Sequence, residues 1–367
     1  MRIAHFSDIH LSNDNFDVFV DTYRSALIKD LEEYNRAHPI DIFVITGDLV
    51  DKGGQSLVKR FKKDKTIKSP YDVFEKEFIT PISNKLGISN DRFLFVPGNH
   101  DIDESQIRWI HEKDMKINLS ESNIKDYLNK NSQKFNYTNR RIQQFKEFEK
   151  RFHFDSPNYD FSNNQSTYSY TSDSKKVGFL LVNDSWRCST CELLNKEHNH
   201  HYFGVSQLEN GLKNLEIKET EINICLFHHS IDDFKESQEL LSFLKRDEIN
   251  FFLYGHYHEN FSGHYLDPGG SCYGFRGRSA LNKPEEEHIR FQPGYHLLDL
   301  NLVSKRVTQI HYRRYSCSNR LFVPDTEWAP QNGIDRNEAH GGSGYKIGRP
   351  NNTKNVFDID ENKLYLE

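Results

Sequence analysis

Aspartate, asparagine and histidine residues recur at five points of this sequence, and each point follows directly after a short apolar run. Seven of them could bind metal: Asp8, His10, Asp48, Asn99, His228, His256 and His258. Carboxylates, an amide and imidazoles together suit Mn²⁺, Fe or Zn²⁺ better than Ca²⁺. Seven ligands are too many for one tetrahedral ion and fit two ions that share a bridging carboxylate. Two ions about 3.5–4 Å apart can stabilise the attacking and leaving oxygens of a phosphoryl displacement.

The apolar runs predict the strands that must position these side chains. They cover 2–6, 42–46, 93–96, 177–182, 222–227 and 250–254, and their near-continuous apolar character is typical of strands buried on both faces. Apolar residues from Phe16 to Tyr34 recur at steps of three and four, which predicts an amphipathic helix. Alternating strands and helices indicate a layered α/β fold. Because the carboxyl ends of strands form the ligand crevice in such folds, we expect the polar residues at one rim.

Four further segments complete the expected organisation. Residues 295–300 and 307–312 alternate more clearly and are expected at a sheet edge. Residues 104–154 are polar and helix-prone, and we interpret them as an inserted helical cap. Residues 316–367 are rich in Asn, Gly and Pro and are expected to form a polar C-terminal extension or linker. The expected division is therefore one domain over 1–315, cap included, followed by that extension.

The composition restricts the class of protein. The 367 residues are 36% hydrophobic and 13% aromatic, which provides a sizeable core and excludes global disorder. A net charge of −6 argues against a protein whose whole surface binds nucleic acid. No apolar run reaches membrane-spanning length, no secretory signal opens the chain, and five cysteines do not suggest a disulfide framework. We therefore expect a cytoplasmic protein with no membrane partner.

The order and rough spacing of the polar motifs resemble those of a known family. Asp8-x-His10, Gly47-Asp48, Gly98-Asn99-His100-Asp101, His228 and Gly255-His256-x-His258 are similar to the signature of the calcineurin-like metallophosphoesterase superfamily, over about residues 1–315. Tyr168-Ser-Tyr, followed by a strand that ends in Val182-Asn183-Asp184-Ser185, resembles its bacterial cyclic-nucleotide phosphodiesterase members. The resemblance implies a four-layer α/β/β/α sandwich. It also implies a hydrolase with two divalent metal ions, Mn²⁺ being favoured and Fe or Zn²⁺ being the alternatives.

The resemblance further implies a role for each motif residue. Asp8, His10 and His258 would bind the first ion, Asn99, His228 and His256 would bind the second, and Asp48 would bridge them. A hydroxide between the ions would be the nucleophile. His100 would stabilise the phosphoryl oxygens or protonate the leaving group, and Asp101 would orient His100.

The fourth motif departs from the family pattern. The family often shows His-x-Pro there, whereas this chain has His228-His229-Ser230. Both histidines therefore remain candidates for the second ion. We favour His228 because it lies nearest the end of the predicted strand.

The segment after the strand at 177–182 admits two interpretations. Cys188-x-x-Cys191, followed by His198, His200 and His201, contains the residue types of a structural zinc site. The spacing matches no common zinc finger, so we favour a solvent-exposed loop near the active site. In that interpretation, the residues expected to approach the substrate are Asp184, Ser185, Trp186 and Arg187.

Two substrate classes remain open. The favoured substrate is a nucleotide-type phosphodiester, with the cap acting as a lid. The alternative is DNA or RNA, because residues 59–68 carry six positive charges against one negative and could form a basic groove with residues 140–151. Charge runs of this kind are usually solvated surface. A third hypothesis is an effector module that binds a protein partner through its tail, where Phe322, Val323 and Trp328 are apolar anchors.

Overall fold

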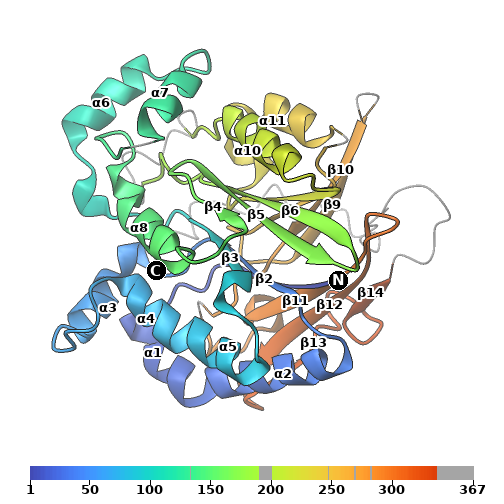
Figure 1. Cartoon of the computed structure of the whole chain (residues 1–367). Helices are drawn as coiled ribbons and strands as arrows, with labels where there is room; N and C mark the ends of the chain where they lie inside the picture. The colour runs from blue at the N-terminus through green and yellow to red at the C-terminus, as the bar shows by residue number, and fades with distance from the viewer. Residues whose placement is uncertain (133, 190–200, 247, 268–269, 282, 337–367) are drawn as a thin grey trace.

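Two seven-stranded sheets form the centre of the molecule (Figure 1). The structure is a computed structural model that describes residues 1–132, 134–189, 201–246, 248–267, 270–281 and 283–336. The first sheet has the order β13-β12-β11-β1-β2-β3, with β14 paired to β12, and the second has the order β4-β5-β6-β7-β8-β10-β9. The strands of the first sheet are β1 (Arg2–Phe6), β2 (Ile42–Thr46), β3 (Phe93–Val96), β11 (Gly294–Asn301), β12 (Arg306–Ser316), β13 (Leu321–Pro324) and β14 (Ile334–Arg336). Those of the second are β4 (Tyr159–Asp160), β5 (Gln165–Ser172), β6 (Lys175–Val182), β7 (Ile222–Leu226), β8 (Phe251–Tyr254), β9 (Phe261–Asp267) and β10 (Gly270–Arg276).

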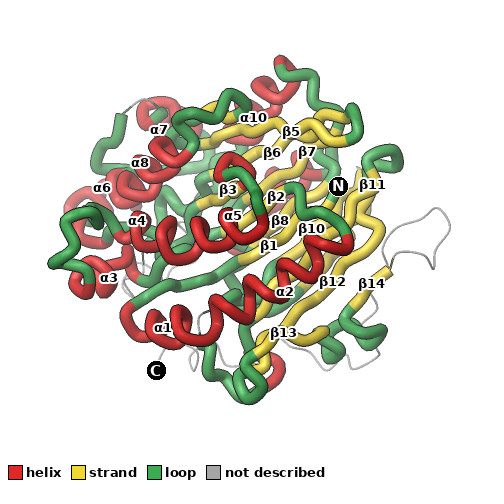
Figure 2. Tube along the Cα trace, turned by 60° about the horizontal axis from the view of Figure 1, so that its bottom comes forward, coloured by secondary structure: helices red, strands yellow, loops and turns green. Residues whose placement is uncertain are grey.

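Helices cover the outer face of each sheet (Figures 1 and 2). On the first sheet they are α1 (Asn13–Val18), α2 (Arg24–Ala37), α3 (Gln55–Arg60), α4 (Pro70–Phe74) and α5 (Thr80–Leu86). On the second they are α10 (Ser206–Ile217) and α11 (Ser237–Leu244). Two π-helical turns, η1 (Phe19–Tyr23) and η3 (Glu75–Ile79), continue α1 into α2 and α4 into α5. The helix expected from Phe16 to Tyr34 is therefore present with a π turn inside it.

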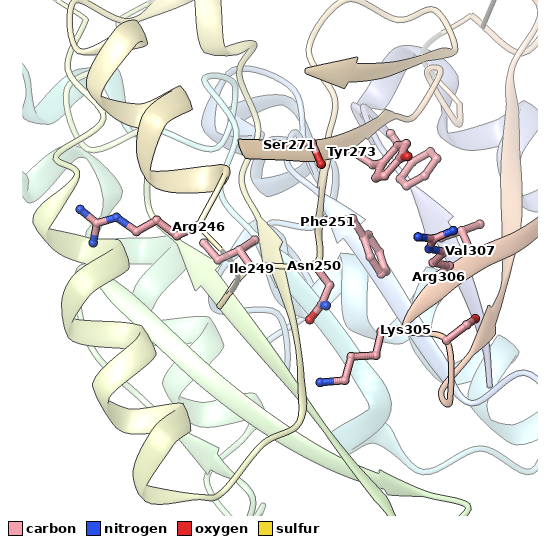
Figure 3. A pocket seen from close by; sticks show the side chains of 11 residues that line it. Arg246, Ile249, Asn250, Phe251, Ser271, Tyr273, Lys305, Arg306 and Val307 are labelled. Carbon is pink, nitrogen blue, oxygen red and sulfur yellow. The ribbon is translucent and has the colours of Figure 1, made fainter. Parts of the chain in front are cut away.

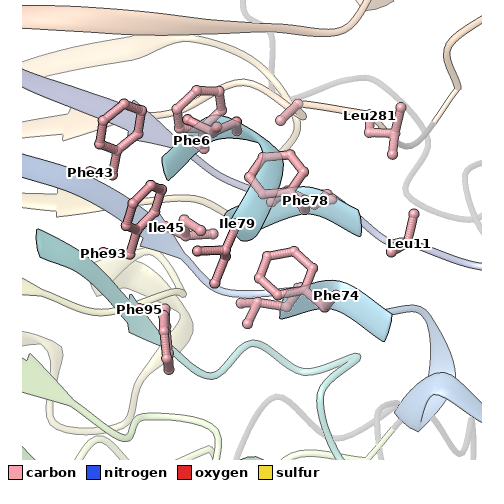
Figure 4. Packing of buried hydrophobic residues seen from close by; sticks show 14 of the residues in the cluster. Phe6, Leu11, Phe43, Ile45, Phe74, Phe78, Ile79, Phe93, Phe95 and Leu281 are labelled. Atoms are coloured by element: carbon pink, nitrogen blue, oxygen red, sulfur yellow. The ribbon is translucent and has the colours of Figure 1, made fainter. Parts of the chain in front are cut away.

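Three apolar layers separate the two sheets and their helices. Along β2 the side chains alternate: Phe43 and Ile45 pack against the helices, whereas Ile42 and Val44 pack against the second sheet. Figure 4 shows the helix-facing layer, where aromatic residues of β1, β2 and β3 meet Phe74 and Phe78. A third layer lies between the second sheet and α10 and α11. The four-layer α/β/β/α sandwich expected from the sequence is confirmed.

The segment expected as a cap is helical and divides into two parts. It contains α6 (Trp109–Asn118), α7 (Ile124–Asn131) and α8 (Gln143–Phe152). Phe145 and Phe148 of α8 pack in the main core, against Tyr71 and Phe95. In contrast, α6 and α7 form a small separate apolar cluster with Trp186 and Tyr202. None of the described helices is both long and apolar enough to cross a bilayer.

Two expectations about the C-terminal third were wrong. β11 and β12 are not edge strands, because β11 lies between β1 and β12, and β13 covers the far side of β12. The expected boundary at 315/316 falls inside β12, and Phe322 is buried in the core against Tyr23, Tyr295 and Tyr315. Residues 316–336 therefore belong to the domain. The rest of the expected extension, 337–367, lies outside the described residues.

Candidate metal centre

The carboxyl ends of five strands converge on one cluster of polar side chains. β1, β2 and β3 of the first sheet deliver Asp8, His10, Asp48 and Asn99, and β7 and β8 of the second deliver His228, His256 and His258. Each of these strands is short, apolar and parallel to its sequential neighbour, so their ends point the same way. The ligand atoms of Asp8, Asp48 and His228 lie within 4.8 Å of one another, which joins the two sheets at this rim.

The first of two groups within the cluster contains Asp8, His10 and His258. Asp8 Oδ1 lies 3.3 Å from His258 Nε2 and 3.8 Å from His10 Nε2, and the two Nε2 atoms are 3.2 Å apart. Asp8 Oδ2 accepts hydrogen bonds from Ser7 Oγ and from the His256 amide. Asp8 Oδ1 is buried and has no hydrogen-bond partner. A buried carboxylate oxygen that faces two imidazole nitrogens fits a cation bound among them.

The second group contains Asn99, His228 and His256. Asn99 Oδ1 lies 3.1 Å from His228 Nε2 and 3.1 Å from His256 Nδ1. Asp48 stands between the two groups, because its Oδ2 is 3.4 Å from His10 Nε2 and 3.4 Å from His228 Nε2. One carboxylate oxygen is therefore shared by both sets of nitrogens, as a bridging ligand requires.

Unusual backbone conformations concentrate at these candidate ligands. Asp8, His10, Asp48, His256 and His258 have φ angles of 51°, 48°, 53°, 77° and 56°, in the left-handed region. Non-glycine residues held in this region cost on the order of 1–3 kcal/mol each and persist where the surrounding structure over-determines them. Five of the seven candidates share this strain. The fold thus holds these side chains in place at a conformational cost, which is typical of functional sites.

Glycines allow the close approach of the ligand loops. Gly47 has a φ of 88°, in the left-handed region that favours glycine. Gly98 has no positive φ and serves another purpose: a Cβ at this position would lie 2.1 Å from Asp48 Oδ1 and 2.4 Å from the Asp48 amide nitrogen, closer than atoms can approach without displacement. A side chain at residue 98 would therefore push the proposed bridging ligand out of position.

The charges in the cluster depend on one another. Burial opposes ionisation of Asp48, but the charges of His228, His100 and His10 outweigh it and hold the pKa of this carboxyl well below its ordinary value. Burial likewise opposes protonation of His228, but Asp48 and then Asp8 raise the pKa of this imidazole to about 10. Each of these two charges therefore stabilises the other.

His100 has a different partner from the one expected. Its Nδ1 lies 2.7 Å from Asp51 Oδ1, and its amide donates to Asp48 Oδ1 at 2.7 Å. The carboxylate of Asp101 instead accepts from the amides of Leu49 and Gly98. The expectation that Asp101 orients His100 was wrong, because the loop turns Asp101 back toward β2. The sequence analysis did not identify Asp51 as the partner of His100. Its position three residues after Asp48, in the same loop, could have indicated that role.

The expectation of a solvent-exposed loop after β6, near His229, was also wrong. Trp186 is 1% exposed and donates from Nε1 to the Tyr202 carbonyl, and Cys188 is 4% exposed. The described part of the 184–189 loop is therefore buried rather than solvent-exposed. Asp184 does not face the rim: its Oδ2 accepts from the amides of His228 and His229 and contacts His229 Nδ1 at 3.0 Å. Cys191, His198 and His200 lie outside the described residues.

The two basic segments are partly neutralised. Arg141 is buried and pairs with Glu112, and Lys146 is buried and pairs with Glu149 at 2.5 Å. Arg60 pairs with Asp17. These three cations form ion pairs within the protein, so part of the positive charge expected in a groove formed by 59–68 and 140–151 is neutralised. Lysines 59, 62, 63, 65 and 68 remain exposed.

A separate cavity lies away from this rim. It has a volume of about 340 Å³, and its lining includes Arg246, Phe251, Tyr273, Lys305 and Arg306 (Figure 3). Phe251 begins β8, whereas His256 and His258 follow the end of that strand. The cavity is therefore at the opposite end of β8 and is not part of the cluster.

Comparison with known proteins gives the family. The profile of the calcineurin-like phosphoesterases matches residues 1–260, which is more than half of the chain and includes every candidate ligand. The chain belongs to the calcineurin-like phosphoesterase family. Calcineurin-like phosphoesterases typically hydrolyse phosphoric esters with two divalent metal ions, and the two groups at the rim provide candidate sites for such ions.

Individual calcineurin-like relatives are distant. The chain is 24% identical over 270 residues to the "Uncharacterized metallophosphoesterase-like protein YydB" of Bacillus subtilis (strain 168). This match covers 71% of the chain and 49% of that protein, so the chain spans about half the length of the curated relative. Among solved structures, a dimetal phosphatase from Danio rerio is 14% identical with a TM-score of 0.42, covering 85% of this chain and 95% of that one. The calcineurin-like phosphoesterase YfkN from Bacillus subtilis is 12% identical with a TM-score of 0.42, covering 88% and 87%.

Proposed function

We propose that this protein is a phosphodiesterase that hydrolyses a nucleotide-type phosphodiester at a binuclear metal centre. The observation that carries the proposal is the position of Asp48, whose Oδ2 is equidistant from an imidazole of each ligand group. Asp8, His10 and His258 are the proposed ligands of one ion, and Asn99, His228 and His256 those of the other. Two divalent ions held there would activate water and withdraw charge from the phosphoryl oxygens.

The chain's own residues supply positioning and proton transfer in this proposal. His100 is partly exposed at the rim, with its side chain 25% accessible, so it can reach a bound phosphate. Its Nδ1 faces Asp51, which fixes the ring and leaves Nε2 available for a substrate oxygen. Burial works against the imidazolium, but Asp48 and Asp51 raise the pKa of His100 above its ordinary value. His100 is therefore suited to donate a proton to the leaving oxygen.

The preference for a nucleotide diester rests on the sequence. The metal ligands do not discriminate a diester from a monoester, whereas the resemblance of 168–170 and 182–185 to cyclic-nucleotide phosphodiesterases favours a diester. The net charge of −6 favours a small nucleotide over a polymer. The four cysteines among the described residues are free thiols, which supports a reducing, cytoplasmic compartment.

The first test compares bis-p-nitrophenyl phosphate with p-nitrophenyl phosphate, using metal-stripped protein resupplied with Mn²⁺. We expect faster hydrolysis of the diester and its loss in Asp48→Asn, because that substitution removes the charge shared by both ligand groups. The exposed Asp14→Asn is the matched control and should retain the wild-type rate. Faster hydrolysis of the monoester would reject the diester assignment. Full activity of Asp48→Asn would reject the metal centre itself.

A nuclease is the alternative function, supported by the five exposed lysines between residues 59 and 68. Binding of a polymer releases counterions, so nuclease activity should fall steeply between about 50 and 200 mM salt. A small nucleotide makes few phosphate contacts and should show a shallow dependence. Measuring hydrolysis of single-stranded DNA and of a cyclic dinucleotide across this range separates the two substrate classes.

A further inference from the structure

A second cluster of metal-binding residue types lies directly behind the candidate centre. Its members are Cys188 from the loop after β6, His201 ahead of α10, and His229 from the loop after β7. Their ligand atoms all lie within 4.8 Å of one another. Cys188 and His229 are buried, at 4% and 2% exposure. None of the three belongs to the seven proposed ligands of the binuclear centre.

One of the two sulfur–nitrogen separations within this cluster matches that of a zinc site, and the other is shorter. A tetrahedral zinc with a Zn–S bond of about 2.3 Å and Zn–N bonds of about 2.0–2.1 Å places sulfur and nitrogen about 3.6 Å apart. Cys188 Sγ is 3.6 Å from His229 Nε2 and 3.0 Å from His201 Nε2. The first separation already has the required value, and the second needs a small outward movement of one side chain.

The surroundings of His229 prepare its Nε2 for a ligand. Asp184 is fully buried, and its Oδ2 contacts His229 Nδ1 at 3.0 Å while accepting from two backbone amides. A carboxylate on one imidazole nitrogen fixes the tautomer that leaves the other nitrogen unprotonated, as is usual for metal-binding histidines. The other oxygen of Asp184 is buried and has no hydrogen-bond partner. Hydrogen bonds between a thiol and two imidazoles would not by themselves require a buried carboxylate at His229 Nδ1.

We propose that Cys188, His201 and His229 bind a third divalent cation, zinc by the chemistry of one thiolate and two imidazoles. Binding forms one Zn–S and two Zn–N bonds and releases the thiol proton to solvent. The ion would tie the loop after β6 to the loop after β7, which carries His228. Its role is therefore structural support for the neighbouring centre.

Metal content tests this site in the full-length chain. We load the stripped protein with excess zinc, remove unbound metal by gel filtration and measure zinc per chain by mass spectrometry. We expect three equivalents for the wild type and two for Cys188→Ser and for His201→Gln. Cys317→Ser is the matched control, because this thiol donates to the Glu286 carbonyl and is not a member of the cluster, and it should retain three equivalents. Two equivalents in the wild type, or three in Cys188→Ser, would overturn the proposal.

Cobalt gives a readout that does not depend on counting. The Co²⁺-loaded wild type should show thiolate-to-cobalt charge-transfer absorption in the near ultraviolet, and Cys188→Ser should lose this absorption while Cys317→Ser keeps it. No such absorption in the wild type would overturn the third site. An active phosphodiesterase with two metals would contradict only this inference, whereas an inactive protein with three metals would contradict only the proposed function.

Discussion

Asp51 and Asp101 lie in neighbouring loops of the rim and act on different partners. Asp51 faces the imidazole of His100, whereas Asp101 is 1% exposed and accepts from backbone amides of both loops. Burial and the nearby charge of Asp48 raise the pKa of Asp101 to about 7, against the effect of those amides. The first acid therefore serves the proposed chemistry, and the second holds the loops together.

Substitution should separate these two roles. His100→Ala is expected to keep both ions and lower kcat by about 10²–10⁴, the range for a general acid. Asp51→Asn should change kcat in the same direction with unchanged metal content. Asp101→Asn should instead lower the urea midpoint of unfolding, because an amide is a weaker acceptor for the amides of Leu49 and Gly98. Normal stability of Asp101→Asn together with normal turnover of Asp51→Asn would contradict this assignment.

His153 links stability to pH at the scale of one residue. Its ring stacks on Tyr159 with centroids 3.8 Å apart, and both ring nitrogens are buried without hydrogen-bond partners. Burial, with the charge of Lys146, lowers the pKa of His153 to about 3. The unfolded chain, with an ordinary pKa of about 6.5, binds the proton more readily, so stability falls as the pH drops below about 6.5.

Between pH 7 and pH 5, His153 is expected to lower the free energy of unfolding by about 2 kcal/mol. The reason is that the unfolded state takes up most of one proton at this residue over these two pH units. Urea unfolding of the wild type and of His153→Phe measures it. Phenylalanine can stack on Tyr159 and does not titrate, so the variant should lose about 2 kcal/mol less over this range. An identical pH dependence in both proteins would show that His153 is not buried in the neutral form.

At the scale of elements, a buried acid adds an ionic link between the cap helix α6 and the rest of the molecule. Glu112 of α6 pairs with Arg141, which precedes α8, and with Arg187, which follows β6. All three side chains are buried, and Arg141 also donates to the Cys188 carbonyl at 2.6 Å. Loss of one partner from such a group leaves uncompensated charge in the interior. The attachment of α6 to the loop beside the metal centre therefore depends on Glu112.

Glu112→Gln is expected to destabilise the protein by about 3–5 kcal/mol, since two guanidinium groups lose their shared carboxylate. The measurement is the free energy of unfolding in urea. Glu121→Gln, an exposed acid between α6 and α7, is the matched control and should change stability by less than about 0.5 kcal/mol. Equal effects of the two substitutions would argue against a buried network.

The strands that carry the proposed ligands could be predicted, and several others could not. β1, β2, β3, β7 and β8 are buried and largely apolar, and each is followed within two residues by glycine, aspartate or histidine, which is a strong local signal. β5 reads QSTYSYTS and β10 reads GSCYGFR, and both depend on pairing with β6 and β8 rather than on their own composition. The position of Asp51 against His100 and of Asp184 against His229 follows from loop geometry that composition does not specify.

At the scale of the whole molecule, the candidate centre connects two sheets. Asp8 and Asp48 belong to the first sheet and His228 to the second, and their ligand atoms lie within 4.8 Å of one another. Cations bound there would cross-link the sandwich at one end of its inner apolar layer. Because only the folded chain assembles both halves of the ligand set, binding should add to the stability of folding.

Removal of metal should therefore lower the thermal midpoint of unfolding. Each ion held at 100 times its dissociation constant contributes about 2.7 kcal/mol, so chelation by EDTA should produce a clear downward shift. Asp48→Asn should show a much smaller downward shift with EDTA than the wild type, because it loses the ligand shared by both ions. A wild-type midpoint that does not respond to EDTA or to added Mn²⁺ would contradict a centre that spans the sheets.

The distribution of the candidate ligands along the chain has a consequence for biosynthesis. The first of them is residue 8 and the last is residue 258, while β1 also needs β11 (Gly294–Asn301) as its antiparallel neighbour. A growing polypeptide on the ribosome thus carries Asp8 and His10 long before their partners exist. The centre can be filled only after residue 258 has emerged, so metal binding cannot guide the early steps of folding.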